Sequence, residues 1–310
     1  MEVILHIGAH RTGTTAMQAW MLQNADALAV SGTAYWGPDR TRAGLFSGLI
    51  KRPDLVTPQD GQNAGRIRMA IAMELDRLSD QGMKRLIISE ENVIGAMPQC
   101  VDMLTLYPDM AGRIERVARA IGPQLRRVAV SIRRYDMWWA SVMAVSVARG
   151  ARVPDARALA RLAGHPRGWR QVIGGVWNTL GLPVSVWSHE GMGADHRAQL
   201  GAMMPRAGLP AGLYEPGRRD NTAPRLGDLH TRLIAAGHRP AQPHQTRWMP
   251  FEGEQRAAMV AHYLEDLAWL RAAPPGIDWM DVSAQVTGPN PGAPTEEEGH
   301  YHDRQASRLA

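Results

Sequence analysis

The sequence predicts an α/β fold: a central, mainly parallel sheet in a three-layer domain, followed by a helical C-terminal half. Three observations lead to this prediction. Short aliphatic runs at residues 3–7, 85–89 and 127–132 have the length and composition of buried strands. Segments with helical periodicity separate these runs. A loop with two glycines follows the first run directly, which is typical of a strand that opens into a helix.

The remaining elements follow from hydrophobic periodicity along the chain. Residues 30–65 show no clear period and are expected to be loop, with at most a short helical piece near 43–50. A fourth strand is expected at 182–187, and helices at 14–29, 67–78, 113–121, 137–148, 169–180, 194–204, 224–236 and 254–271. Residues 1–285 are expected to form a single domain. Residues 286–310 contain too little apolar surface to fold, so we expect a disordered C-terminal tail there.

Composition limits the classes of protein to consider. The chain has 35 Lys and Arg against 30 Asp and Glu, and its arginines are scattered, so we expect no nucleic-acid partner. Cys100 is the single cysteine, which excludes an internal disulfide and fits a reducing compartment. We find neither a signal peptide nor an apolar run long enough to span a membrane, and therefore expect a cytoplasmic protein. The histidines lie too far apart for a recognisable zinc site, and no metal is expected.

Residues 8–15, Gly-Ala-His-Arg-Thr-Gly-Thr-Thr, have the pattern of a P-loop-like phosphate cradle. In such a loop the backbone N–H groups and the helix N-terminus point at one anion. Arg11 adds a charge with fork geometry, and Thr14 and Thr15 add hydroxyl groups. The nucleotide-triphosphate motif carries lysine where this chain has Thr14, which favours a ligand with a 5′-phosphate and no γ-phosphate. An ordinary strand–turn–helix remains the alternative.

Polar residues also follow the other two strands. Ser89-Glu90-Glu91-Asn92 ends the second strand, and Arg133-Arg134 ends the third. In parallel sheets ligands lie at the carboxyl ends of the strands, so three polar strand ends are expected to converge on one site.

The segment from His10 to Thr15, two residues beyond a strand, resembles the 5′-phosphosulfate loop of sulfotransferases that use 3′-phosphoadenosine-5′-phosphosulfate (PAPS). That family usually has Lys-x-Gly-Thr-Thr, so Arg11 departs from its commonest residue. The resemblance implies that Arg133 and Ser141, eight residues apart, hold the nucleotide's 3′-phosphate, with Arg219 near it. The implied cofactor-binding residues are therefore His10, Arg11, Thr12, Gly13, Thr14, Thr15, Arg133, Ser141 and Arg219.

The resemblance also implies catalytic roles. Arg11 would stabilise the leaving 5′-phosphate oxygen of PAPS, with PAP as the product. The second strand end is where the family places its general base. Strand alternation sends Glu90 and Glu91 to opposite sides, and the Ser-x-Glu pattern of bacterial members selects Glu91, with Glu90 as the second candidate. Both carboxylates could instead offset a helix dipole.

The expected function is transfer of a sulfuryl group from PAPS to a hydroxyl or amine of a small-molecule, carbohydrate or lipid acceptor. Two other functions stay open. One is a nucleotide kinase or NTPase on a P-loop-like scaffold, disfavoured by Thr14 at the lysine position. The other is a non-catalytic protein that binds nucleotides or polyanions.

Overall fold

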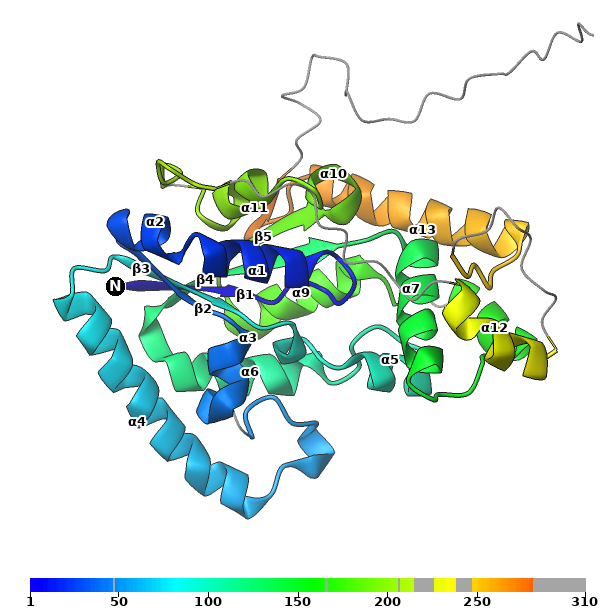
Figure 1. Cartoon of the computed structure of the whole chain (residues 1–310), viewed down its shortest axis with the longest axis horizontal. Helices are drawn as coiled ribbons and strands as arrows, with labels where there is room; N and C mark the ends of the chain where they lie inside the picture. Colours follow the sequence, from blue (N-terminus) through cyan, green and yellow to red (C-terminus); the bar gives the residue numbers. More distant parts are fainter. Residues whose placement is uncertain (47, 165–166, 206, 215–225, 238–246, 281–310) are drawn as a thin grey trace, which may run out of the picture.

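One sheet of six parallel strands organises the computed structural model, which describes all residues except 47, 165–166, 206, 215–225, 238–246 and 281–310 (Figure 1). The strand order is β2-β3-β1-β4-β5-β6, and every pair of neighbours is parallel. The strands are β1 (Glu2–His6), β2 (Thr33–Trp36), β3 (Arg85–Ser89), β4 (Leu125–Ile132), β5 (Val184–Ser188) and β6 (Ile277–Trp279). The predicted α/β class with a parallel sheet is confirmed.

Alternation along the strands separates two apolar cores, one on each face of the sheet. Val3 and Leu5 of β1 belong to the larger core, whereas Ile4 belongs to the smaller one. Helices α1, α2, α10 and α11 cover the face with the smaller core, and the main helices of the opposite face are α4, α5, α6, α7, α9 and α13 (Figure 1). A helical layer on each side of the sheet makes the three-layer arrangement.

Helices account for more than half of the described residues. They are α1 (Thr14–Gln23), α2 (Ala25–Val30), α3 (Pro38–Arg40), α4 (Pro58–Asp80), α5 (Met97–Met103), α6 (Met110–Ile121), α7 (Tyr135–Ala148), α8 (Ala156–Ala163), α9 (Trp169–Leu180), α10 (His189–Met192), α11 (His196–Met203), α12 (Leu226–Ala235) and α13 (Gly253–Arg271). Short 3-10 turns occur at Pro53–Leu55, Glu91–Val93 and Gly122–Gln124, and a π-helical turn at Thr41–Leu45. None of the helices in the described ranges is long and apolar enough to cross a membrane.

The position of β1 in the sheet fixes the position of the glycine loop. Leu5 of β1 pairs with Ile88 of β3 on one side and with Val128 of β4 on the other. The chain that leaves β1 enters α1 on one face, while the chains that leave β3 and β4 enter helices on the opposite face. Such a divergence opens a crevice at the carboxyl ends of the strands, which is where α/β proteins bind ligands.

Two expectations about the first eighty residues are wrong. The helix expected over 14–29 is two helices that meet at Asn24, whose side chain bonds the Trp20 carbonyl and the backbone of Tyr214. The region 30–65, expected to be loop, contains β2, α3, the π-helical turn and the start of α4. The first two turns of α4 lack an apolar period, and a capping box between Thr57 and Asp60 begins the helix instead.

The expected C-terminal half is helical in its described parts, but it also contributes β6 to the edge of the sheet. Only three residues form β6, too few for a period-two pattern to be recognised in the sequence. The expected tail at 286–310 and the domain boundary at 285 lie outside the described residues.

Candidate functional site

The glycine loop follows β1 and turns sharply before α1. Two residues have left-handed backbone conformations: Arg11 with φ 64° and Gly13, the N-cap of α1, with φ 85°. The Thr12 hydroxyl is buried between the Ala9 carbonyl and the Ser131 hydroxyl of β4. Thr12 therefore fixes the loop to the neighbouring strand instead of facing a ligand.

The start of α1 presents unused hydrogen-bond donors. Within the described residues, the backbone N–H groups of Gly13, Thr14 and Thr15 have no protein acceptor. The helix carries neither a capping side chain nor an acidic residue in its first turn. Buried Thr14 and exposed Thr15 are its first two residues. An uncompensated helix N-terminus favours a bound anion.

Arg11 contacts both Ser141 and Arg133, through its side chain and its backbone carbonyl respectively. Arg11 Nε donates to Ser141 Oγ at 2.9 Å, and Arg133 Nη1 donates to the Arg11 carbonyl at 2.8 Å. These three residues come from the loop, the end of β4 and the middle of α7. The structure thus brings together side chains that the sequence resemblance assigned to two different phosphates.

The local charge around this cluster is strongly positive. Burial lowers the pKa of Arg11, and the charges of Arg149 and Arg247 lower it further. Burial also lowers the pKa of Arg133, with Glu190 partly opposing the effect. Arg133 Nε is buried and has no acceptor within the described part of the chain. Half-buried arginines that repel one another and keep an unused donor are suited to binding a polyanion.

Glu90 and Glu91 lie at the end of β3, as expected, but their environments differ. Glu90 is fully buried and begins the 3-10 turn that follows β3 by accepting from Asn92 N at 3.1 Å. It also accepts from Asn92 Nδ2, from Thr41 Oγ1 at 2.6 Å and from Arg42. With its acceptor positions filled by protein donors, Glu90 has the surroundings of a structural carboxylate.

Glu91 faces the crevice, and its side chain is 14% exposed. Gln18 Nε2 of α1 donates to one carboxylate oxygen at 2.9 Å, and Arg42 Nη2 donates to the other at 2.7 Å. Burial acts to raise the pKa of Glu91. The bond from Gln18, its own backbone N–H and the charges of Arg42 and His10 outweigh burial, so the pKa lies below its ordinary value. Glu91 is therefore ionised at neutral pH and able to accept a proton.

His10 holds the loop against α7 and the region after β3. Its backbone N–H donates to Tyr107 Oη at 2.9 Å, and its carbonyl accepts from Trp138 Nε1 at 2.7 Å. The ring is buried, with Nε2 3.4 Å from Asn92 Oδ1. Trp138 is fully buried, so it packs behind the loop and bonds the loop backbone.

Beneath the loop, a chain of polar contacts connects β1, β3 and α1. His6 Nδ1 is 2.8 Å from Ser89 Oγ, which also accepts from Gln18 Nε2 at 3.2 Å. A Cβ at Gly8 would lie 2.6 Å from Ser131 Oγ and 2.8 Å from His6 Nε2. Only glycine fits where the loop leaves the strand.

Two site residues were missed from the sequence. His189 begins α10 directly after β5, and a Cβ at Gly13 would lie 3.6 Å from its ring. His189 directly follows a strand, so the same reasoning that identified the polar ends of the other strands could have identified it. Arg42 lies in the π-helical turn and bridges both glutamates, and no spacing in the sequence signals it. Arg219, within the segment 218–222, lies outside the described residues. The other expected site residues border the loop or the crevice.

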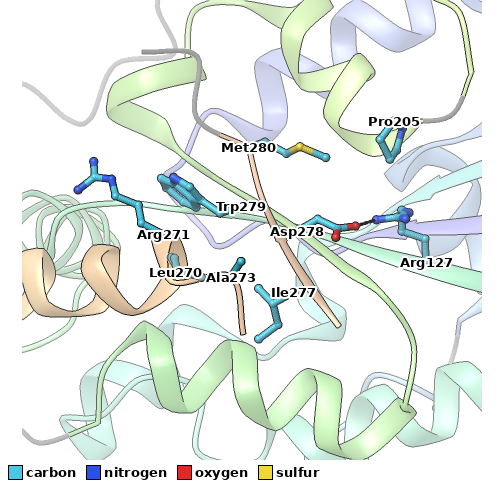
Figure 2. Close-up of a pocket in the computed structure, with 9 residues that line it drawn as sticks. All are labelled: Arg127, Pro205, Leu270, Arg271, Ala273, Ile277, Asp278, Trp279 and Met280. Atoms are coloured by element: carbon cyan, nitrogen blue, oxygen red, sulfur yellow. Dashed lines mark hydrogen bonds and ion pairs between the residues drawn. The ribbon is translucent and has the colours of Figure 1, made fainter. Parts of the chain in front are cut away.

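A cavity lies elsewhere, beside β6 (Figure 2). It encloses about 520 Å³, and its two facing charges, Arg127 and Asp278, already form an ion pair with each other. None of the loop or crevice residues lines it. The polar groups converge at the crevice and not at this cavity, so the crevice is the candidate functional site.

Comparison of the chain with protein-family models, with curated proteins and with solved structures gave no match. Any functional assignment therefore depends on the geometry described above.

Proposed function

We propose that the chain is a sulfotransferase that moves a sulfuryl group from PAPS to a hydroxyl or amine acceptor. The observation that carries the proposal is that Arg11 contacts both Ser141 and Arg133 beside the uncompensated N-terminus of α1. A nucleotide with phosphates on both the 3′ and 5′ positions offers anions to both sets of donors at once.

The residues fit such a cofactor in three respects. The N–H groups of Gly13 to Thr15 lack protein acceptors among the described residues. Arg133 Nε is buried without a partner in the same ranges. Burial lowers the pKa of Arg11 and of Arg133, and neighbouring arginine charges lower both further. Donors without an acceptor and positive charges held close together both cost free energy, and a bound polyanion would reduce both costs.

PAPS supplies the activated sulfuryl group, and the protein's contribution is positioning and charge stabilisation. Arg11 and the loop N–H groups stabilise the negative charge on the departing 5′-phosphate. Arg133 and Ser141 hold the 3′-phosphate. Glu91 lies at the adjacent strand end, ionised, and takes the proton of the acceptor.

The cofactor assignment is tested by thermal unfolding with PAP, AMP and ATP. A ligand that binds only the native state stabilises it by about 2.7 kcal/mol at a hundredfold excess over its dissociation constant. PAP should raise the melting temperature more than AMP or ATP, because it alone offers a 3′-phosphate. Equal shifts from AMP and PAP would refute the 3′-phosphate site. A larger shift from ATP with Mg²⁺ would favour a kinase or NTPase.

A further inference from the structure

Arg42 joins the two glutamates at the end of β3. Its Nε donates to Glu90 Oε2 at 3.0 Å, and its Nη2 donates to Glu90 Oε1 at 2.8 Å. The same Nη2 donates to Glu91 Oε1 at 2.7 Å. One guanidinium is therefore shared between a buried structural carboxylate and the carboxylate that faces the crevice.

The two halves of this contact are unequal. Glu90 is fully buried, and Thr41 and Asn92 help Arg42 to hold it. The contact with Glu91 is a single hydrogen bond at the surface, and the Arg42 side chain is 45% exposed. If Arg42 Nη2 left Glu91, the bond from Arg42 Nε to Glu90 Oε2 could still hold the guanidinium on Glu90.

The backbone that carries Arg42 is suited to such a movement. Arg42 lies in the π-helical turn Thr41–Leu45, in which Ala43 and Gly44 leave helical geometry, Gly44 with φ 116°. No atom lies within 4 Å of a Cβ built at Gly44. Single π-helical turns are frequent at functional sites, and this one places a charged side chain over the crevice.

The hydrogen bonds to Glu91 determine whether its carboxylate is free to accept a proton. Gln18 occupies Oε2 from the side of α1, and Arg42 occupies Oε1 from the exposed side. An acceptor substrate that approaches from solvent must therefore compete with Arg42 for the Oε1 atom of Glu91. Each hydrogen bond and the positive charge also weaken Glu91 as a base.

We propose that Arg42 is a latch that holds Glu91 in an inactive arrangement until an acceptor displaces it. This inference rests on the proposed function, because it assigns regulation to the same site. The arrangement would keep water from using Glu91 while PAPS is bound alone. In that side reaction, water oxygen bonds to sulfur, the bond from sulfur to the 5′-phosphate oxygen breaks, and a water proton passes to Glu91, giving PAP and sulfate.

The surroundings of Glu91 must be considered in any pH measurement. The charged or titratable groups that face it from neighbouring elements are His6 of β1, His10 of the loop, Tyr35 of β2, Arg42, Glu90 and Tyr107. Arg42 is the cation that contacts it directly. A change at Arg42 should therefore be visible in the titration of Glu91 itself.

The first experiment needs no substrate. The ¹³C carboxyl resonance of Glu91, identified by its loss in Glu91→Gln, is titrated in the wild type, in Arg42→Lys and in Arg40→Lys. Lysine keeps a positive charge for Glu90 but cannot span two carboxylates, so the Glu91 midpoint should rise in Arg42→Lys. Arg40 is the control, because it pairs with Glu74 and not with Glu91. An unchanged midpoint in Arg42→Lys overturns the latch.

The second experiment measures release of PAP from PAPS without any acceptor. Arg42→Lys should raise this rate on the order of tenfold, part of the 10² to 10⁴ that a general base contributes. Adding Glu91→Gln should remove the gain. An unchanged or slower rate in Arg42→Lys refutes the latch. If PAP binds no variant, the proposed function fails instead, while the titration still reports on the contact. Arg42→Gln is less suitable, because it leaves buried Glu90 without its charge partner.

Discussion

Arg11 acts through both its backbone and its side chain. Its left-handed backbone turns the loop, its carbonyl accepts from Arg133, and its guanidinium reaches Ser141. Substituting the side chain leaves the backbone contact with Arg133 in place. The two possible roles of the guanidinium, binding and catalysis, can therefore be separated.

Arg11→Ala should lower turnover at least a hundredfold, about 2.7 kcal/mol of barrier, with a smaller loss of PAP affinity. The reason is that a charge that acts on the leaving oxygen contributes more as the transition state forms. Arg11→Lys should retain much of the activity, because it supplies the same charge. Steady-state kinetics and PAP calorimetry measure both effects, with Arg119→Ala, at an exposed arginine that pairs with Glu115, as the control. Near-normal turnover in Arg11→Ala, with weaker PAP binding, would make Arg11 a binding residue only.

His6 is a buried titratable group beneath the loop. It stacks on Trp187 with ring centroids 5.6 Å apart, and Ser89 bonds its Nδ1. Burial lowers its pKa from 6.5 to about 4, with the charge of Glu91 partly opposing the effect. Between these two pH values the unfolded chain binds a proton that the folded chain does not, so folding stability increases with pH across this window.

Acid should therefore weaken the fold before the carboxylates titrate. The His6 contribution to the free energy of unfolding is complete above about pH 6.5 and falls by up to about 3 kcal/mol as the pH decreases to about 4. His6→Phe keeps a ring for Trp187 and removes the titration. Urea unfolding at several pH values should show a shallower pH dependence for this variant than for the wild type. Identical slopes would show that His6 is not kept neutral in the folded protein.

At the scale of elements, three helices are joined where α9 begins. Asp266 of α13 accepts from Trp169 N at 2.8 Å and from the Tyr135 hydroxyl of α7. A Cβ at Gly168, the N-cap of α9, would lie 2.5 Å from both Asp266 Oδ2 and Tyr135 Oη, and 2.7 Å from His262 Nε2. The junction of the three helices thus requires glycine at position 168.

Gly168→Ala should destabilise the protein by about 1–3 kcal/mol, because the new methyl group forces this buried network apart. Gly174→Ala in the same helix is the matched control, since no atom lies within 4 Å of its Cβ position. The control should be neutral or stabilising by up to about 1 kcal/mol through helix propensity. Denaturant midpoints of both variants measure the difference. Equal midpoints would show that the junction tolerates a side chain.

Sequence patterns predicted the elements that bury a regular apolar face. The runs that became β1, β3, β4 and β5 were identifiable because they are buried on both sides. Strands β2 and β6, with four and three residues, are defined by pairing with a neighbour and not by their own composition. The start of α4 depends on a cap, and caps carry no periodicity.

The residues of the candidate site likewise divide into those that sequence patterns predicted and those that they did not. Gly13, Glu91 and Arg133 were found because each follows a strand, and parallel strands bring their carboxyl ends together. Arg42 was not found, because its place over Glu91 depends on an irregular turn between β2 and α4. Nor could the sequence show that the Arg11 and Ser141 side chains touch, since this contact depends on how α7 packs.

At the scale of the whole molecule, the site is assembled from both helical layers. The loop and α1 belong to one face, whereas Ser141 lies on α7 of the other face (Figure 1). Arg11 and Ser141 are 130 residues apart in the sequence, and Gln18 and Glu91 are 73 apart. The crevice therefore exists only when both layers are packed on the sheet.

The central place of β1 has a consequence for the order of events during synthesis. Strand β1 cannot pair with either neighbour until β3 has been made, 83 residues later, and its other side waits for β4. Closing such long loops is slow, and an unpaired aliphatic strand is prone to aggregate in the meantime. A nascent chain that stops before Leu125 would expose one edge of β1 and display the glycine loop without Arg133. The glycine loop is thus made well before the strands that complete it, so the risk of co-translational misfolding falls on the same residues that define the candidate site.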